Sequence, residues 1–316
     1  MAQRRNSRAG KGRGGVLGAL GFAALVLIVY LAEPLGLGSL LGGIFGGDVP
    51  VSAIAELPEE GLAVSYIDVG QGDATLIVCN GEAMLIDAGV PEEGQTVVDY
   101  LTASGVDSLV YAAVTHAHDD HCGGMDDVVD AFPIGTLFAP YTEFDSSGAF
   151  TYFEDAAAER GLYITVPTIG STFTLGGATV SFVGPVGDWG DDLNDSSLII
   201  RVDYGSRSFL FPGDASDGTI ADCAYVGGYD LDCDVLKLGH HGSSTSTDEE
   251  ILDLTTPEIA VASCGLDNSY GHPHDEVVDL LAVRGIELLR TDLDGTVTVW
   301  TDGEELSLYE AGEQAA

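Results

Sequence analysis

The histidines of this chain are concentrated in three short stretches, and their types and spacing could support chemistry. Seven histidines occur among 316 residues. Three lie in the sequence HAHDDH at 116–121, beside two carboxylates, and two pairs lie in GHHGS at 239–243 and in GHPH at 271–274. Imidazole and carboxylate groups are the usual protein ligands of zinc, manganese and iron. The pattern therefore predicts a metal-dependent enzyme.

The first stretch directly follows an apolar run at 109–114, which predicts a strand. The end of a strand is where α/β folds expose functional loops. His116 and His118, two residues apart on an extended loop, can face one metal ion. Asp120 and His121 continue round the loop and can face a second ion. A polar surface loop without function is the alternative, but surface loops seldom carry so many potential ligands.

Two later stretches also follow apolar strands. The run FLF at 209–211 leads to Gly213 and Asp214, which would present a carboxylate at the strand tip. Most Gly-Asp pairs only form turns, so Asp214 is a candidate metal ligand only because the other motifs accompany it. His240 and His241 are framed by glycines, which suits one metal ligand and one orienting or proton-transfer group. A surface loop is the alternative for this pair.

His272 precedes Pro273 near a predicted helix start. Helix N-termini favour anions, so His272 is a candidate to hydrogen-bond an anionic substrate or to protonate a leaving group. His274, expected inside the first turn of that helix, is more typical of a surface residue. Helix capping is the alternative for both histidines. The glycines of DVGQGD at 68–73 predict a tight turn.

Hydrophobic periodicity predicts the elements that must position these residues. Short apolar or alternating runs predict strands at 63–69, 74–78, 83–86, 109–114, 172–175, 179–183, 197–202, 208–211, 235–238, 259–262, 286–289 and 296–300. Helical spacing predicts helices at 94–104, 125–131, 150–160, 217–225, 247–254 and 274–283. Strand pairs come first and strand–helix alternation follows, which predicts an α/β domain with sheets covered by helices.

The distribution of charge and apolar residues divides the chain. Residues 1–15 form a basic tail, 16–32 are uncharged and apolar, 33–61 read as a linker, 62–302 form the main domain, and 303–316 form an acidic C-terminal tail. The apolar segment predicts a single membrane-spanning anchor. Basic residues next to such a segment stay in the cytoplasm, so the main domain is expected outside the cytoplasm. The alternative is a cleaved signal peptide and a secreted protein.

The main domain is strongly acidic. All 51 Asp and Glu residues but only six of the 11 Lys and Arg residues lie beyond residue 15. Such a surface repels polyanions, so tight, non-specific binding of duplex DNA is not expected. High acidity with little lysine also suits a salty milieu, in which charges are screened.

The chain has five cysteines. Disulfides are permitted in an exported domain, and Cys223 with Cys233 is the nearest pair in sequence. Buried free thiols are the alternative.

Taken together and in this order, DVGQGD, HAHDDH, the strand ending in Gly-Asp, GHHGS and NSYGHPH resemble the metallo-β-lactamase superfamily. More narrowly, they are similar to the C-terminal domain of ComEC-type competence proteins, which serve DNA uptake. The resemblance spans about Val64 to Trp300. It implies a four-layer αββα sandwich with a metal centre along the edge where the two sheets meet. It also implies hydrolysis, and for the nearest relatives hydrolysis of DNA phosphodiesters.

The resemblance also implies a ligand for each position of a two-metal centre. His116 and His118 would bind one ion, Asp120 and His121 the other, Asp214 would bridge the two, and His240 would close the second site. Asp87 fits the aspartate that supports the metal loop.

Many superfamily members carry a further metal-binding histidine before the bridging aspartate, whereas this chain has none between His121 and His240. Asp195 is the candidate to supply an oxygen ligand there. With an oxygen ligand in place of a histidine, the first metal site would bind its ion more weakly, would have harder ligands and would tolerate Mn²⁺ better.

The sequence therefore predicts an exported, membrane-anchored, metal-dependent phosphodiesterase or nuclease with two divalent ions, Zn²⁺ or Mn²⁺, that activate water. Its substrate would be a phosphodiester, including single-stranded DNA. The residues expected to take part in catalysis are Asp120, Asp214, His241 and His272, the last two as candidates for phosphate contact and leaving-group protonation. One alternative is hydrolysis of a small ester, lactone, lactam or cell-envelope phosphodiester. The other is a non-catalytic metal-binding domain.

Overall fold

The computed structural model describes residues 60–144, 146–187 and 192–309. The basic tail (1–15), the apolar segment expected to be an anchor or signal (16–32) and residues 33–59 of the expected linker lie outside the described residues. Within the described ranges, no helix is long and apolar enough to cross a membrane.

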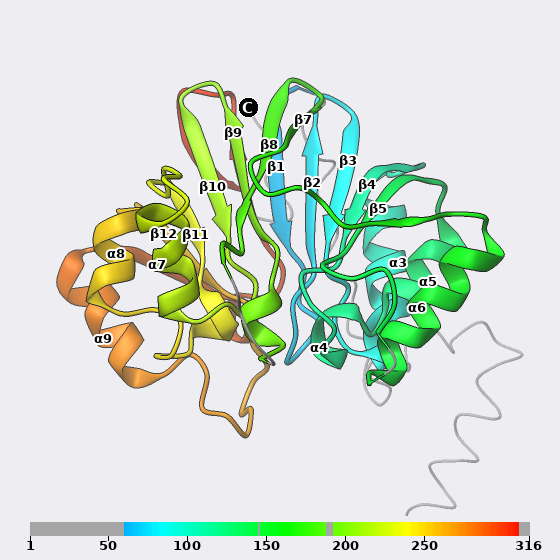
Figure 1. The fold of residues 1–316 in the computed structure, drawn as a ribbon. Coiled ribbons are helices and arrows are strands. Elements are labelled where there is room, and N and C mark those ends of the chain that lie inside the picture. The colour runs from blue at the N-terminus through cyan, green and yellow to red at the C-terminus, as the bar shows by residue number, and fades with distance from the viewer. Residues whose placement is uncertain (1–59, 145, 188–191, 310–316) are drawn as a thin grey trace, which may run out of the picture. The chain divides into compact units, whose positions relative to one another are not determined.

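Two β-sheets form the centre of the domain (Figure 1). The first sheet has eight strands in the order β15-β14-β1-β2-β3-β4-β5-β6. Its strands are β1 (Leu62–Tyr66), β2 (Thr75–Cys79), β3 (Glu82–Ile86), β4 (Leu109–Ala113), β5 (Ile134–Phe138), β6 (Ile164–Thr165), β14 (Val297–Thr301) and β15 (Leu306–Tyr309). The strands from β15 to β3 pair antiparallel, and those from β3 to β6 pair parallel.

The second sheet has seven strands in the order β13-β12-β11-β10-β9-β8-β7. Its strands are β7 (Thr172–Leu175), β8 (Ala178–Gly184), β9 (Ile199–Tyr204), β10 (Arg207–Phe211), β11 (Val235–Lys237), β12 (Ile259–Ala262) and β13 (Glu287–Arg290). The strands from β13 to β10 pair parallel, and those from β10 to β7 pair antiparallel.

Helices cover the outer face of each sheet, as Figure 1 shows. The helices over the first sheet are α3 (Gly94–Ala103), α5 (Met125–Ala131) and α6 (Gly148–Glu159), and those over the second are α7 (Asp217–Tyr225), α8 (Glu249–Thr255) and α9 (Asp275–Arg284). The short helices α4 (Asp119–Cys122) and α10 (Thr291–Asp294) and 3₁₀ turns at Pro91–Glu93, Asn194–Ser196 and Gly239–Gly242 complete the set. Side-chain caps determine where several helices begin. For example, the Ser216 side chain accepts a hydrogen bond from the Thr219 amide at the start of α7.

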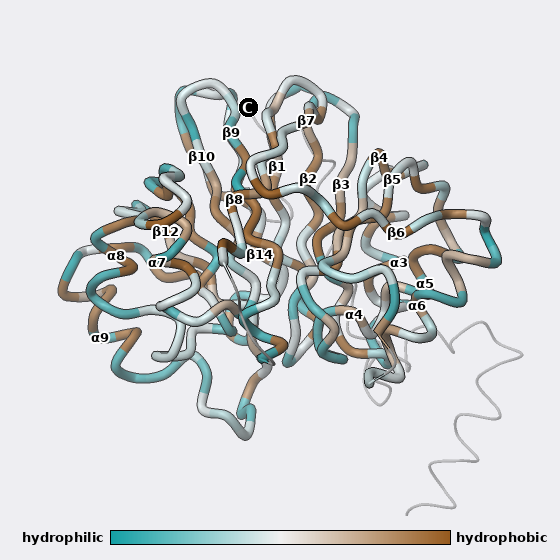
Figure 2. The backbone as a smooth tube through the Cα atoms, viewed as in Figure 1, coloured by the Kyte–Doolittle hydropathy of each residue, from teal (hydrophilic) through white to brown (hydrophobic). Residues whose placement is uncertain are grey.

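Three hydrophobic clusters hold these four layers together, one between the sheets and one under each set of helices. Neighbouring residues of one strand point into different clusters. In β2, Leu76 packs under the helices and Ile77 packs between the sheets. In β10, Leu210 packs under the helices and Phe209 packs between the sheets. Because both faces of a central strand are buried, the strands read as continuous apolar runs. In Figure 2 these runs are the brown segments inside the domain.

The α/β sandwich with two sheets agrees with the expected fold class. The expected C-terminal tail differs from the structure, because Leu306–Tyr309 forms strand β15, which pairs with β14. The strands β5 and β6 and the short helices α4 and α10 were not expected either. All five cysteines lie in the described part of the chain and are buried and free, so Cys223 and Cys233 form no disulfide there.

Candidate metal centre

Four side chains from four separate segments meet in a buried cluster. Asp73 precedes β2, His121 lies in α4, Asp214 follows β10, and His241 follows β11. Each offers one nitrogen or oxygen atom, and these atoms all lie within 4.8 Å of one another. The cluster lies where loops of the two sheets come together, as functional sites of open α/β sheets commonly do.

His121 lies between two carboxylates. Its Nδ1 lies 2.8 Å from Asp87 Oδ2, and its Nε2 lies 3.1 Å from Asp214 Oδ1. Asp87 also accepts a hydrogen bond of 2.7 Å from the Thr115 amide. This carboxylate orients the imidazole so that Nε2 faces the cluster, as partners of metal-binding histidines usually do.

Asp214 is placed by a tight approach of two segments. Gly213 has φ of 58°, and a Cβ atom there would lie 2.8 Å from the Ser197 side chain. The Asp214 amide donates a hydrogen bond of 3.0 Å to Ser197 Oγ. Burial raises the pKa of Asp214, but His121 and His241 outweigh burial and hold that pKa well below its usual range. The carboxylate is therefore ionised, as a metal ligand must be.

The paired histidines have different surroundings. His241 is buried, its Nδ1 lies 2.9 Å from the Ser263 carbonyl oxygen, and its Nε2 lies 3.3 Å from Asp120 Oδ2. His240 is partly exposed, and its Nε2 lies 3.7 Å from Asp214 Oδ2. Both histidines have positive φ, 48° and 58°, a strained backbone conformation that is concentrated at functional sites. The structure thus places His241 in the cluster and His240 at its edge, whereas the sequence prediction named His240 as the metal ligand and His241 as a catalytic residue.

His116 and His118 form a second group beside the cluster. His116 Nε2 and His118 Nδ1 lie 3.0 Å apart, so both rings turn toward the same place. The ring centroids of His116 and His121 are 4.2 Å apart. Burial lowers the pKa of His116 well below its usual value, which keeps this imidazole neutral.

Asp195 does not join either group. Its Oδ1 accepts a hydrogen bond of 2.9 Å from the Ser216 amide, just before α7. The preceding residue, Asn194, lines the cavity instead, and its Oδ1 is buried without a hydrogen-bond partner. In this short 3₁₀ turn, Asp195 thus points toward the start of α7 and Asn194 toward the cavity. The side-chain oxygen that remains free to bind a ligand in the cavity is that of Asn194.

Asp73 and Lys237 were missed by the sequence analysis, which assigned DVGQGD only a turn. Both side chains are buried, and the Lys237 ammonium forms an ion pair with Asp73. The Asp73 amide donates a hydrogen bond of 3.0 Å to the Asp120 carbonyl oxygen, so the DVGQGD turn is packed against HAHDDH. The chain has only two lysines, and a lysine within an apolar strand immediately before GHHGS was the signal that could have found this pair.

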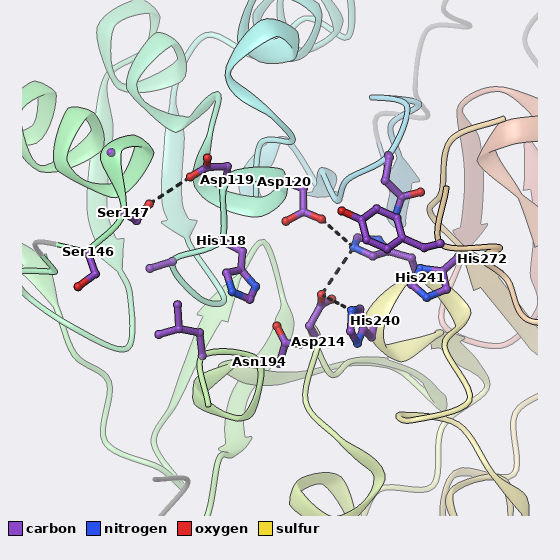
Figure 3. Close-up of a pocket in the computed structure, with 15 residues that line it drawn as sticks. His118, Asp119, Asp120, Ser146, Ser147, Asn194, Asp214, His240, His241 and His272 are labelled. Carbon is purple, nitrogen blue, oxygen red and sulfur yellow. Dashed lines mark hydrogen bonds and ion pairs between the residues drawn. The ribbon is translucent and has the colours of Figure 1, made fainter. Parts of the chain in front are cut away.

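A cavity of about 440 Å³ opens beside the cluster (Figure 3). Its walls include Asp120, Asp214, His240, His241 and His272, and Figure 3 shows the ion pairs that join Asp214 to both paired histidines. Burial and the neighbouring histidines lower the pKa of His272 to about 4, and its buried Nδ1 has no hydrogen-bond partner.

The donor set suits a divalent cation. Buried polar atoms normally have hydrogen-bond partners. Here each cluster member has a buried atom without one, namely Asp73 Oδ1, His121 Nε2, Asp214 Oδ1 and His241 Nε2. Two imidazoles and two carboxylates are ligands typical of zinc, manganese or iron sites. A bound cation would satisfy these four atoms, so the residues fit a metal.

Comparisons with known proteins agree with this geometry. A sequence profile of the metallo-β-lactamase superfamily matches residues 67–266. The chain is 34% identical over 244 residues to competence protein ComA of Neisseria gonorrhoeae, which covers 76% of this chain and 32% of that protein. It is 30% identical over 252 residues to ComE operon protein 3 of Bacillus subtilis, which covers 74% of this chain and 32% of that protein.

Recombination protein 2 of Haemophilus influenzae is 31% identical over 78% of this chain and 30% of that protein. The chain thus spans about a third of the length of these curated relatives. Among solved structures, CmlA, a diiron β-hydroxylase from Streptomyces venezuelae, has a TM-score of 0.52 at 16% identity, over 77% of this chain and 54% of that one. That likeness concerns the fold alone.

Proposed function

The chain belongs to the metallo-β-lactamase superfamily, and from this premise we propose that it is a metal-dependent phosphodiesterase whose substrates include single-stranded DNA. The observation that carries the proposal is the buried cluster of two aspartates and two histidines beside an open cavity. Relatives named as competence and recombination proteins support DNA as the class of substrate.

Two groups of residues would hold divalent ions, Zn²⁺ or Mn²⁺. The cluster would hold one ion, and His116 with His118 would hold a second, with Asp214 between the two groups. Bound ions would supply a water of lowered pKa and a positive charge toward a phosphoryl oxygen. The second group has fewer charged ligands, which supports weaker binding there.

The remaining polar residues of the cavity would position the substrate. His272 is neutral near pH 7 because its pKa is about 4, so it would donate a hydrogen bond from a neutral ring rather than transfer a proton. His240 is partly exposed on the same wall, and its ring centroid lies 5.3 Å from that of His272. Asp120 Oδ2 lies 3.3 Å from His241 Nε2, the nitrogen that would face the ion, so Asp120 would be a further oxygen ligand there.

The charge distribution supports a flexible or short substrate over a duplex. Each of the six basic side chains in the described ranges forms an ion pair with a carboxylate: Arg160, Arg201, Arg207, Lys237, Arg284 and Arg290. Non-specific affinity for duplex DNA comes from cations that meet phosphates, and these cations are already paired.

The test is a comparison of substrates on the chain of 316 residues. The metal-stripped protein is reloaded with Mn²⁺ or Zn²⁺ and assayed on single-stranded DNA, duplex DNA and bis-p-nitrophenyl phosphate. We expect metal-dependent cleavage of the strand and of the small diester, with the duplex cut at least tenfold more slowly. No hydrolysis of any phosphodiester by the loaded protein would refute the proposal.

A second candidate is hydrolysis of a small ester, lactone or lactam. The acidic surface favours it, because a small neutral substrate is not repelled. Turnover of nitrocefin or of a lactone, without turnover of bis-p-nitrophenyl phosphate, would establish this candidate instead. If metal binds and no substrate of either class reacts, the domain is a non-catalytic metal-binding one.

We also propose that the apolar segment 16–32 anchors the domain outside the cytoplasm, with the basic residues 1–15 inside. Protease added to intact cells should then remove the domain, and protection of the domain would refute this placement. A mature N-terminus near residue 56 would instead support secretion after signal cleavage.

A further inference from the structure

An exposed aromatic ring lies on the wall of the cavity. Tyr270 lines the cavity and is 66% exposed. It stacks on His272, with ring centroids 5.6 Å apart and an interplanar angle of 19°. His272 in turn lies nearly parallel to His241, a cluster residue, at 28° and 6.0 Å. A stack of three rings thus runs from the buried cluster to the solvent.

The loop that carries Tyr270 is held by its own hydrogen bonds. The Asn268 Oδ1 accepts hydrogen bonds from the amides of Tyr270 and His272, at 3.2 and 3.0 Å. The Asn268 Nδ2 donates to the carbonyl oxygens of Gly265 and His272. Gln71 Oε1 accepts a hydrogen bond of 3.1 Å from the Gly265 amide, which ties this loop to the DVGQGD turn. The ring is therefore presented on a fixed support, and little ordering is needed when a ligand binds.

The cavity has no lysine or arginine that could hold a phosphate backbone. None of the residues that line it is a lysine or an arginine, and the basic side chains in the described ranges are all ion-paired. Apart from the one phosphate that bound ions would contact, a nucleic-acid strand at the cluster must therefore be bound through groups other than its phosphates. The faces of the bases are the general alternative, because every base can stack on an aromatic ring.

We propose that Tyr270 is a stacking platform for one unpaired nucleobase of the strand whose phosphate lies at the cluster. This inference rests on the proposed function and adds that the protein recognises a base of the DNA substrate. A base inside a duplex already stacks on its neighbours, so the platform selects single strands or strand ends.

The test measures binding and cleavage separately. For binding, a short oligothymidylate that carries one 2-aminopurine is titrated with the loaded protein, because stacking of this base on the tyrosine quenches its fluorescence. For cleavage, KM is compared between an oligothymidylate and a strand of equal length built from abasic sugar phosphates. Both measurements are made on wild type, Tyr270→Phe, Tyr270→Ala and, as a matched control, Tyr163→Ala, which removes an exposed tyrosine that does not line the cavity.

We expect the wild type and Tyr270→Phe to quench the probe and to prefer the base-bearing strand. Tyr270→Ala should weaken probe binding roughly 5- to 150-fold, the range that base–aromatic stacking supports, and should bring the two KM values together. Tyr163→Ala should behave as wild type. Equal probe binding by Tyr270→Ala and wild type would overturn the inference.

The same experiment separates the inference from the proposed function. If the wild type quenches the probe through Tyr270 but cleaves neither strand, the stacking site stands and the phosphodiesterase proposal fails. If the wild type cleaves both strands equally well and Tyr270→Ala changes neither, the stacking site fails and the phosphodiesterase proposal stands.

Discussion

At the scale of single residues, the ion pair between Lys237 and Asp73 is the least expected feature of the site. A lysine is almost never fully buried unless it is paired. Here it neutralises one of two carboxylates that lie beside the same two histidines. The pair thus lowers the repulsion between Asp73 and Asp214 when no metal is bound, and it holds Asp73 at the cluster.

Replacing Lys237 with Met should destabilise the metal-free protein by about 3–5 kcal/mol, because Asp73 would stay buried without its partner. The double variant Lys237→Met with Asp73→Asn should recover much of that loss. Urea unfolding gives the free energy of unfolding of the wild type and of both variants, and so measures the loss and its recovery. As a matched control, Arg160→Met breaks an exposed pair with Asp130 and should cost about 1 kcal/mol or less. A loss for Lys237→Met no larger than that of the control would contradict the account.

The pKa values of both cluster histidines, His121 and His241, are raised, and His241 shows what this means for the pH dependence of the metal-free protein. Burial lowers the pKa of His241, but the carboxylates of Asp214 and Asp73 outweigh burial and raise it to about 9. A raised folded-state pKa contributes stability that is complete below the unfolded value, near 6.5, and is lost as the pH rises through about 9.

We therefore expect the free energy of unfolding of the metal-free protein to fall between pH 7 and pH 9. His241→Gln should make this part of the profile less steep, since one of the two cluster histidines with a raised pKa is gone. Thermal melts of wild type and variant across this range provide the measurement. A profile that rises toward pH 9 in the wild type, or that is identical in the variant, would show that His241 is not held in its charged form.

At the scale of elements, the sequence predicted the central strands and the covering helices well, because their apolar runs are continuous and their faces are buried. It did not predict β15, whose alternating, partly exposed residues Leu306–Tyr309 gain a strand only by pairing with β14. It named His240 rather than His241 as the metal ligand, because the sequence does not show which of two adjacent histidines faces a cluster; that depends on the backbone of this turn, in which both histidines have positive φ. Asp73 was missed because its partners are distant in sequence.

The DVGQGD turn depends on Gly72 for its close approach to α4. A Cβ atom at Gly72 would lie 2.6 Å from the Asp120 carbonyl oxygen. We expect Gly72→Ala to cost about 1–3 kcal/mol of stability and to weaken metal binding, because the turn must move away from HAHDDH.

The matched control is Gly218→Ala in α7, where a Cβ atom would meet only Ser216 Oγ, at 4.0 Å, and should stabilise the helix by about 0.5–1 kcal/mol. Denaturant unfolding and a Zn²⁺ titration measure both variants. Equal stability and equal metal affinity for Gly72→Ala and wild type would contradict this role of the turn.

At the scale of the whole molecule, the formal net charge of −40 dominates. With the described basic side chains already paired, the remaining carboxylates repel one another and destabilise the compact state. Salt shortens the range of this repulsion, to about 3 Å at 1 M.

The melting temperature should therefore rise as NaCl is increased from 0.05 to 2 M. A variant with three exposed acids neutralised, Asp222→Asn, Glu276→Gln and Asp279→Asn, should depend less on salt than the wild type. Thermal melts at several salt concentrations test both expectations. A melting temperature that does not respond to salt would mean that the acidic surface carries no significant repulsion.

The central claim is that the buried cluster binds the metal that supports phosphodiester cleavage. The most direct measurement is the cleavage rate of single-stranded DNA at a metal content determined on the same sample, for wild type, Asp214→Asn and the surface control Asp222→Asn. We predict that Asp214→Asn loses at least one bound ion per chain and at least 100-fold in rate, while Asp222→Asn matches the wild type. Unchanged metal content and unchanged cleavage in Asp214→Asn would contradict the account.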